Sequence, residues 1–429
     1  MTKIDAVSRM ASPISMAKLF KMAYDGRDLR PLRAQAIARL QSDLADAAAL
    51  MDLSVIDQLL GDQSAGLKWQ AEALGLQRLY RSSWPASTEA LHLLAFMAPG
   101  DVGANTPIEF LLEGADVVLH SLYIVPGQGP SQALLRSLPD HDVAIVAACE
   151  SDRNRPVLHE IQRMIQSWPC AVLNQPAAVS LASREHLFSI LQSVPGLRMM
   201  TTARIGRAAL AQMGAGLKTV GQFLPGAAFP LICRFIDSHA GRALVKLDSP
   251  SSIAPYLADH ADPEFFISPF VDYRSADGLF RKYRIMWVDG RPFPCHLAIS
   301  DGWKIWYYNA GMGLSAAKRE EEARFMATFG AGFAHRHATA LATIAERFGL
   351  EYFGIDCAEL RDGRLLVFEG GNDLVAHDMD PPRLYPYKSE HIQKLFAAFR
   401  DMLNRKSLRA RSPYEPEFFR PRGYRSIPA

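Results

Sequence analysis

The sequence predicts a mixed α/β protein of several domains, and three observations lead to this class. With 429 residues, 49% of them apolar and 21% charged, the chain can form two or three domains around a sizeable core. Its first part has apolar residues at helical spacing, whereas from about residue 89 short apolar strands alternate with helical segments. Two later pairs of strands turn at Asp-Gly, a strong signal for antiparallel hairpins. The sequence therefore predicts a helical extension, then a small parallel sheet, then antiparallel sheets.

The composition bears on whether the protein binds nucleic acid or membranes and on the compartment in which it is found. A net charge of +2 gives no sign of a nucleic-acid or membrane-surface partner. No apolar run approaches the roughly 18 residues that a bilayer-spanning helix needs. The five cysteines show no CxxC spacing, which fits a reducing compartment. With no signal-peptide pattern at the N-terminus, we expect a cytoplasmic protein.

Residues 1–88 form the predicted helical extension. Apolar positions recur every three or four residues over 16–24 and 32–51. Small and large residues alternate over 65–80, which is typical of a helix packed on another helix, and this stretch resembles a degenerate tetratricopeptide unit. We expect the extension to pack on the main body, to mediate homo-oligomer formation, or both.

The next segment alternates strands and helices. Buried-strand runs occupy 91–97, 116–124 and 141–149, and a glycine-containing loop with a helix at 107–113 follows the first of them. This order predicts a small parallel α/β domain. The loop lacks the GxGxxG pattern, so it carries no dinucleotide-binding fingerprint.

Residues 350–380 are the most informative stretch for function. Two strand-like runs flank Asp362-Gly363, and the resulting hairpin can bring Asp356 near Glu369, with Asn372 beyond a glycine turn. Three such oxygen ligands at a strand end suit Mg²⁺, which takes its remaining ligands from water and phosphate. A surface hairpin with ordinary polar ends is the alternative, and these residues alone do not separate the two.

A second hairpin, turning at Asp289-Gly290, presents a cation within an apolar strand. Strand alternation places Lys282, Arg284 and Met286 on one face. Arg284 precedes an apolar run, and a buried cation needs an anionic partner. We therefore expect an anionic partner beside Arg284.

The order of these motifs resembles that of the ATP-grasp ligases, in the branch of glutathione synthetase and the RimK-like glutamate ligases. The metal-binding hairpin of that family has Gly-(Ile/Val)-Asp, then Asp-Gly-x-Leu-Leu-Val-Phe-Glu, then a nearby Asn. The resemblance covers about 90–400 and is most specific over 172–202, 229–247 and 279–372. It implies an ATP-grasp fold in this order: helical extension (1–88), small parallel α/β domain (89–200), lid subdomain (201–270), metal-binding and catalytic subdomain (271–403) and basic, proline-rich tail (404–429).

The same resemblance implies a metal site. Asp356, Glu369 and Asn372 would hold Mg²⁺ that bridges the phosphates of ATP. The family pattern is Glu-x-Asn, whereas this chain has Glu369-Gly-Gly-Asn372, so Asp373 is an alternative to Asn372.

The resemblance also implies nucleotide and catalytic contacts. Residues expected to contact ATP include two arginines at positions where the family usually has lysine, and a glycine in the flap over the triphosphate. The full set is Arg184, Arg234, Gly241, Lys246 and Phe270. Arg284, Lys304 and Asn309 are expected to act on the substrate and the transferring phosphoryl group.

The implied reaction is ATP- and Mg²⁺-dependent ligation of a carboxylate to an amine through an acyl phosphate, with release of ADP and phosphate. The carboxylate and amine would be small molecules or peptides. Two alternatives are an ATP-grasp kinase that phosphorylates a hydroxyl, and a degenerate module that binds nucleotide or protein without catalysis.

Overall fold

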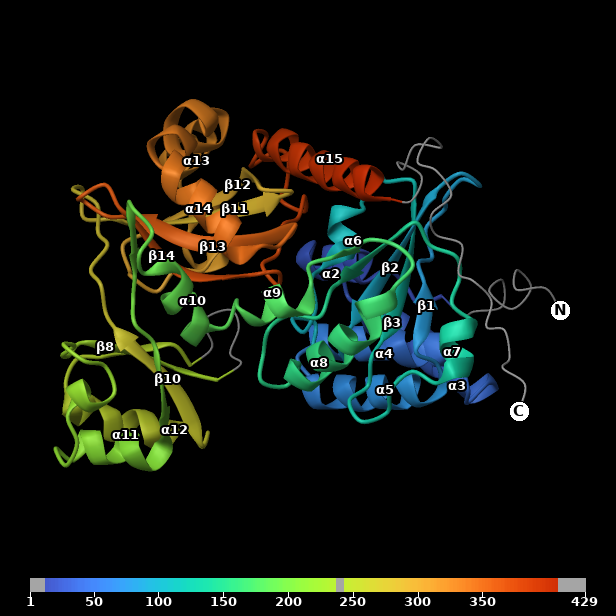
Figure 1. Ribbon diagram of the computed structural model, residues 1–429, viewed down its shortest axis with the longest axis horizontal. Helices are drawn as coiled ribbons and strands as arrows, with labels where there is room; N and C mark the ends of the chain where they lie inside the picture. Colours follow the sequence, from blue (N-terminus) through green and yellow to red (C-terminus); the bar gives the residue numbers. More distant parts are fainter. Residues whose placement is uncertain (1–11, 237–242, 408–429) are drawn as a thin grey trace, which may run out of the picture.

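The structure, a computed structural model, describes residues 12–236 and 243–407 and confirms the mixed α/β class. Three sheets organise the described chain, in the strand orders β1-β3-β2-β4-β5, β7-β10-β8-β9 and β12-β11-β13-β14-β6. Figure 1 shows the first sheet and its helices on the right, the third sheet above left with α13–α15, and the second sheet below left with α11 and α12. None of the described helices is both long enough and apolar enough to cross a bilayer.

The N-terminal part is helical, with two differences from the prediction. The expected 32–51 helix is two helices, because Asp46 accepts a hydrogen bond from the backbone N–H of Ala49 and begins a new one. The expected 65–80 helix ends earlier, and the residues after it form a strand antiparallel to β3. The elements are α2 (Met16–Tyr24), α3 (Arg30–Ser42), α4 (Ala47–Leu59), α5 (Gln63–Leu76) and β1 (Leu79–Arg81).

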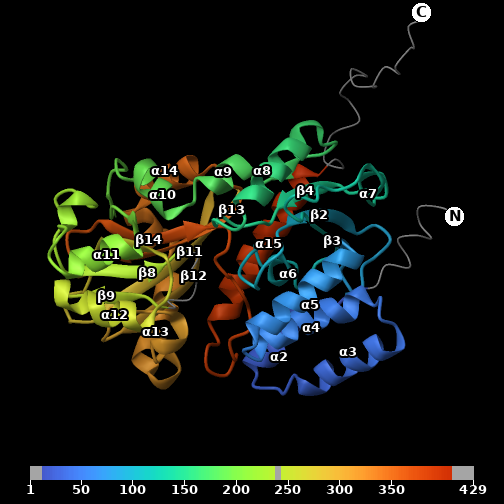
Figure 2. The ribbon, with the colours of Figure 1, turned by 90° about the horizontal axis from the view of Figure 1, so that it is seen from below.

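The first sheet has the predicted parallel core. Strands β2 to β5 pair in parallel, and only β1 on the edge is antiparallel. Figure 2 shows α4 and α5 covering one face of this sheet and α8 the other. The elements are β2 (Leu91–Met97), α6 (Ile108–Leu111), β3 (Val117–Tyr123), α7 (Gln132–Arg136), β4 (Val143–Val146), α8 (Arg155–Met164), β5 (Val172–Leu173) and α9 (Pro176–Ser180).

The second sheet is antiparallel and carries two helices on one side. Its elements are β7 (Ala203–Gly206), α11 (Arg207–Gly214), β8 (Leu231–Phe235), β9 (Val245–Leu247), α12 (Ile253–Asp259) and β10 (Glu264–Pro269). The flap expected between β8 and β9, with Gly241, lies outside the described residues.

The third sheet contains both predicted hairpins. Its elements are α10 (Arg184–Leu191), β6 (Leu197–Met199), β11 (Phe280–Val288), β12 (Arg291–Ser300), α13 (Ala316–Ala327), a π-helical turn (Gly330–Ala334), α14 (Ala338–Phe348), β13 (Tyr352–Glu359), β14 (Leu365–Gly371) and α15 (Lys388–Lys406). Strand β6 pairs in parallel with β14, so this part of the expected 89–200 segment belongs to the last sheet. Helix α15 continues to Lys406, past the start of the expected tail at 404, and residues 408–429 lie outside the described chain.

The ladder between β11 and β13 sets the position of the central carboxylate. Gly354 lies against Met286, and a Cβ atom added at position 354 would lie only 2.5 Å from the Met286 sulfur. The absence of a side chain lets β13 approach β11, where Asp356 pairs in register with Arg284 and, on its other side, with Glu369. One backbone ladder therefore places a cation and two carboxylates in a row.

Candidate active site

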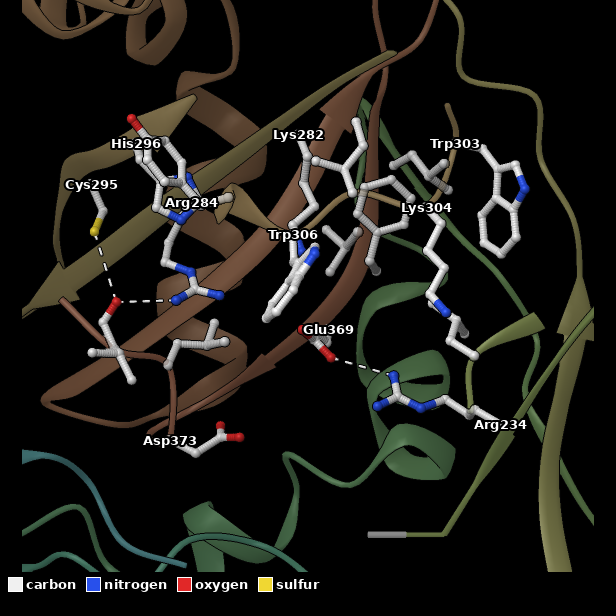
Figure 3. Close-up of a pocket in the computed structure, with 18 of the residues that line it drawn as sticks. Arg234, Lys282, Arg284, Cys295, His296, Trp303, Lys304, Trp306, Glu369 and Asp373 are labelled. Atoms are coloured by element: carbon white, nitrogen blue, oxygen red, sulfur yellow. Dashed lines mark hydrogen bonds and ion pairs between the residues drawn. The ribbon is translucent and has the colours of Figure 1, made fainter. Parts of the chain in front are cut away.

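A cavity of about 540 Å³ is lined by side chains of the second and third sheets, with Phe20 of α2 and Phe110 of α6 from the N-terminal part of the chain. Figure 3 shows Arg284 and His296 on one side of it, Arg234 and Lys304 on the other, and Glu369 between them. Three kinds of side chain line it. The cations are Arg184, Arg234, Lys282, Arg284, Lys304 and Lys388, and the carboxylates are Glu369, Asp373 and Asp380. The aromatic rings are Phe20, Phe110, Phe266, Phe270, Trp303, Trp306, Tyr307, Tyr308 and His377.

Asp356 lies behind this wall and is fully buried. Its carboxylate accepts from Arg284 Nε at 2.8 Å and from the second guanidinium nitrogen at 3.0 Å, and Lys282 Nζ lies 2.6 Å away. Burial raises the pKa of Asp356, but the two cations outweigh burial and hold it well below its usual range. The expectation of an anionic partner for Arg284 is confirmed, and that partner is Asp356.

Glu369, opposite Asp356 on the ladder, also lies between two cations. An Arg184 guanidinium nitrogen is 2.5 Å from its carboxylate and one of Arg234 is 3.5 Å away. Burial raises the pKa of Glu369, whereas Arg184 and Arg234 lower it, with a net value of about 2. Burial, followed by repulsion from Arg184, lowers the pKa of Arg234 to about 10.

We call these six residues the cationic cluster: Arg184, Arg234, Lys282, Arg284, Asp356 and Glu369. Four positive and two negative groups leave a net charge of +2 on one wall of the cavity. Mutual repulsion between the cations is relieved by an anion, so the wall is complementary to a phosphate chain.

Asn372 and Asp373, the two alternatives for the third metal ligand, follow β14 and lie in different surroundings. Asn372 is fully buried, and its Nδ2 donates to Thr106 Oγ1 at 3.0 Å and to the Ala148 carbonyl at 3.2 Å. It does not line the cavity, whereas Asp373 does. The placement favours Asp373 over Asn372 as the residue that faces a ligand.

The carboxylates of Asp356 and Glu369 have the ligand chemistry that a magnesium ion needs, but their present ion pairs differ from a preformed metal site. They are hard oxygen ligands on adjacent strands, as Mg²⁺ prefers. Their partners are now cations, and within residues 12–236 and 243–407 no group of three or more His, Cys, Asp or Glu side chains could hold a metal. A phosphate chain that pairs with the arginines would release carboxylate oxygens toward a divalent ion, whose other ligands would be water and phosphate.

The remaining predicted residues differ in their placement. Lys304 lies on the cavity wall and is exposed, and no described residue pairs with its ammonium group. Asn309 does not line the cavity, because its amide accepts from Trp306 N–H and donates to the Lys304 carbonyl, both at 3.0 Å. Through these two hydrogen bonds the Asn309 side chain holds the backbone of the loop that carries Lys304.

The two predicted residues of the lid sheet lie together. Phe270 lines the cavity and packs edge-on against Trp303, with ring centroids 5.7 Å apart. Lys246 is not part of the lining; its ammonium lies 4.8 Å from the centre of the Phe270 ring and 2.7 Å from Asp248. Phe270 therefore presents its ring to the cavity, and the Lys246 ammonium group lies against that ring.

Sequence reasoning missed a second group of charged and hydroxyl side chains, which we call the tyrosine cluster: Tyr24, Tyr307, Tyr387, Glu322, Asp380 and Lys388. Lys388 Nζ donates to Asp380 at 2.7 Å and lies 3.3 Å from Glu322. Tyr24 donates to Asp380 at 2.6 Å, and Tyr307 and Tyr387 donate to Glu322 at 2.9 and 2.7 Å. These residues come from α2, α13, α15 and two loops, so no local pattern in the sequence indicates their meeting.

Lys282 was also missed as a site residue, although a signal for it was present. Strand alternation already placed it on the same face as Arg284. Its ion pair with Asp356 follows from that placement. Phe20, on α2, gave no such signal, because only the tertiary fold brings the N-terminal helices to the cavity.

Comparisons with known proteins give distant structural likenesses. No family model matches the chain, and no curated protein matches it. Among solved structures it is similar to a RimK domain protein ATP-grasp from Sphaerobacter thermophilus (15% identity, 73% of this chain, 99% of that chain, TM-score 0.39). It is also similar to D-alanine–D-alanine ligase from Bacillus anthracis (13%, 74% and 98%, TM-score 0.41) and to VanG D-Ala:D-Ser ligase from Enterococcus faecalis (10%, 73% and 100%, TM-score 0.42).

One of these proteins is named for ATP-grasp and two are named as ligases. The side chains of the cavity, and not these distant likenesses, are the basis of the functional proposal.

Proposed function

We propose that this protein is an ATP-dependent carboxylate–amine ligase of the ATP-grasp type. The observation that carries the proposal is the cationic cluster: two carboxylates face each other across one ladder, and four cations leave a surplus of positive charge on the cavity wall. This arrangement suits a metal-bound triphosphate better than a neutral ligand or a metal alone.

The residues divide the work along the cavity. Phe266 and Phe270, from the lid sheet, give an apolar surface for a purine ring. Arg184 and Arg234 would pair with the phosphate chain, and Arg284 with the phosphoryl group in transfer. Asp356 and Glu369 would hold Mg²⁺, which when bound neutralises phosphate charge.

The chemistry needs no side-chain nucleophile. A carboxylate oxygen of the substrate attacks the γ-phosphorus, the bond from that phosphorus to the β,γ-bridging oxygen breaks, and ADP leaves with the electron pair. An amine nitrogen then attacks the acyl carbon, phosphate departs, and the nitrogen loses a proton to give an amide. The protein contributes positioning and charge stabilisation, which the cationic cluster supplies.

The first test is thermal stability of the full chain with a non-hydrolysable ATP analogue, with and without Mg²⁺. A ligand that binds only the folded state at 100 times its Kd adds about 2.7 kcal/mol to the free energy of unfolding. We expect a Mg²⁺-dependent rise in Tm for the wild type and a much smaller rise for Arg184→Met. Arg274→Met, which removes an exposed arginine paired with Asp272, is the matched control and should keep the wild-type rise.

No rise in Tm in either condition would contradict the nucleotide site. If the rise is present, ADP release should depend on a carboxylate, and hydroxylamine should trap an acyl hydroxamate. ADP release without a trapped hydroxamate would indicate transfer to a hydroxyl, and thus the kinase alternative.

A further inference from the structure

One part of the cavity wall is formed by aromatic rings from four separate segments. We call these residues the aromatic end: Phe20, Phe110, Trp306, Tyr308 and His377. Phe20 of α2 packs edge-on against Phe110 of α6 at 5.9 Å between ring centroids, and Trp306 packs against Tyr308 at 6.0 Å. These rings belong to no part of the proposed nucleotide site.

The rings of this end are incompletely covered by protein. Trp306 is 45% exposed and Tyr308 is 54% exposed, although both line the cavity. Large aromatic surface on the wall of a cavity is stabilised when a ligand with a flat apolar group covers it. The aromatic end therefore has the chemistry to bind a ring.

Helix α2 is fixed at both of its ends, so Phe20 is held in place on this wall. At the start, Glu109 accepts from Ser15 Oγ at 2.6 Å and from the Ala17 N–H at 3.2 Å. At the other end, Tyr24 donates to Asp380 and its ring lies 5.8 Å from that of Tyr308. Phe20 and Tyr24 are four residues apart and share one helix face.

A carboxylate finds cations next to this end. Lys304 lies two residues before Trp306 in the same loop, and no described residue pairs with its ammonium group. Arg284, on the adjacent wall, donates to the Val375 carbonyl at 3.1 Å as well as to Asp356. A ligand with a carboxylate at the cations and a ring at the aromatic end fits both features.

We propose that α2 forms one wall of the carboxylate-substrate subsite, that this subsite takes a carboxylate bearing an aromatic side chain, and that Phe20 determines this preference. As a statement about the substrate, this rests on the proposed ligase function. As a statement about binding, it rests on the aromatic end alone.

The test is calorimetric titration of the full chain with L-phenylalanine, L-alanine and glycyl-L-phenylalanine, with and without the ATP analogue and Mg²⁺. We expect at least tenfold tighter binding of a phenylalanine ligand than of L-alanine, since an aromatic ring buries a large apolar area. Glycyl-L-phenylalanine distinguishes a free amino acid from a peptide terminus as the source of the ring, and binding of either one supports the proposal.

Two variants test the role of the rings. Phe20→Leu keeps apolar bulk without a ring, and Tyr308→Ala truncates an exposed side chain whose loss leaves the core unchanged. Each should lower the ratio of phenylalanine to alanine affinity by roughly three- to tenfold, as expected for a lost ring–ring contact. Lys18→Ala, on the exposed face of the same helix, should leave the ratio unchanged.

Equal binding of L-alanine and both phenylalanine ligands, or an unchanged ratio in Phe20→Leu, would overturn the proposal. These outcomes are separable from failure of the proposed function, because the rise in Tm with Mg²⁺ and the ATP analogue reports on the cationic cluster. Ring binding without that rise would leave the aromatic subsite standing and remove the ligase assignment.

Discussion

The cationic cluster and the tyrosine cluster are two sets of charged side chains on one cavity, and they differ in how their charges are balanced. In the cationic cluster four cations accompany two carboxylates. In the tyrosine cluster one cation, Lys388, accompanies two carboxylates, which also accept hydrogen bonds from three phenol groups and from the Leu297 N–H.

The difference shows in the carboxyl groups. Asp356 has its pKa driven well below the usual range in spite of burial. Glu322 has its pKa raised, because burial outweighs Lys388 and the hydrogen bonds. A cluster with more cations than carboxylates is electrostatically complementary to an anion. Hydroxyl groups, in contrast, satisfy the hydrogen-bonding capacity of a buried carboxylate within the protein. The first cluster is thus built to receive a ligand and the second to hold α2, α13 and α15 together.

The largest expected effect comes from Asp356→Asn. It removes the charge shared by Lys282 and Arg284 and should lower the free energy of unfolding by about 3 kcal/mol, because it leaves poorly hydrated cations without a partner. Urea denaturation measures it. Asp362→Asn, at the turn of the same hairpin, loses an exposed pair with Arg364 and should cost no more than about 0.5 kcal/mol. An equal loss of unfolding free energy in the two variants would show that the Asp356 carboxylate does not stabilise Lys282 and Arg284.

Lys388→Met should have a smaller effect on stability and little effect on nucleotide binding. Asp380 keeps the Tyr24 hydroxyl, and Glu322 keeps two tyrosines and the Leu297 N–H, so we expect a cost of about 2 kcal/mol. The rise in Tm with the ATP analogue and Mg²⁺ should remain as in the wild type.

The control for that variant is Lys394→Met, on the same helix, which loses only an exposed pair with Glu390. A Lys388→Met protein that folds but has lost the nucleotide response would place the tyrosine cluster in the nucleotide site and end the distinction between the two clusters.

The last expected effect concerns Glu369→Gln, whose loss of stability relative to the wild type is present at neutral pH and shrinks in acid. The pKa of Glu369 is lowered from 4.5 to about 2 in the folded protein, so the folded state binds fewer protons than the unfolded state between these values. The resulting stability is fully present above about pH 4.5 and is lost as the pH falls toward 2. Glu369→Gln should therefore show a flatter decline of unfolding free energy between pH 5 and 3 than the wild type. Parallel curves would show that Arg184 and Arg234 do not act on this carboxylate.

The sequence predicted those parts of the site that local patterns control. The Asp-Gly turn predicted a hairpin that brings Asp356 near Glu369, and the structure pairs the two residues across a register shift between Asp356 and Cys357. Alternation also placed Arg284 on a face that needed an anion, and Asp356 is that anion. The cap of α10 is likewise local, since the Ser183 hydroxyl accepts from the His186 N–H three residues later.

Contacts between distant segments were beyond sequence reasoning. Glu369, a carboxylate of the predicted metal site, pairs with Arg184, which belongs to helix α10 and lies 185 positions away. Asn372 faces the first sheet through Thr106, a residue 266 positions away. Phe20 reaches the cavity because α2 packs between Glu109 and Asp380, and neither partner has a signature that links it to α2 in a single sequence.

The hydrogen bond between Tyr24 and Asp380 joins residues 356 positions apart and has a consequence for how the chain matures. At ribosomal rates of about 5 to 20 residues per second, roughly 20 to 70 s separate the synthesis of these two residues. Helix α2 is therefore synthesised well before the partner that holds its C-terminal end. During that interval the aromatic face of α2 has no cavity to line, and the newly made chain must keep it from other apolar surfaces until α15 has formed.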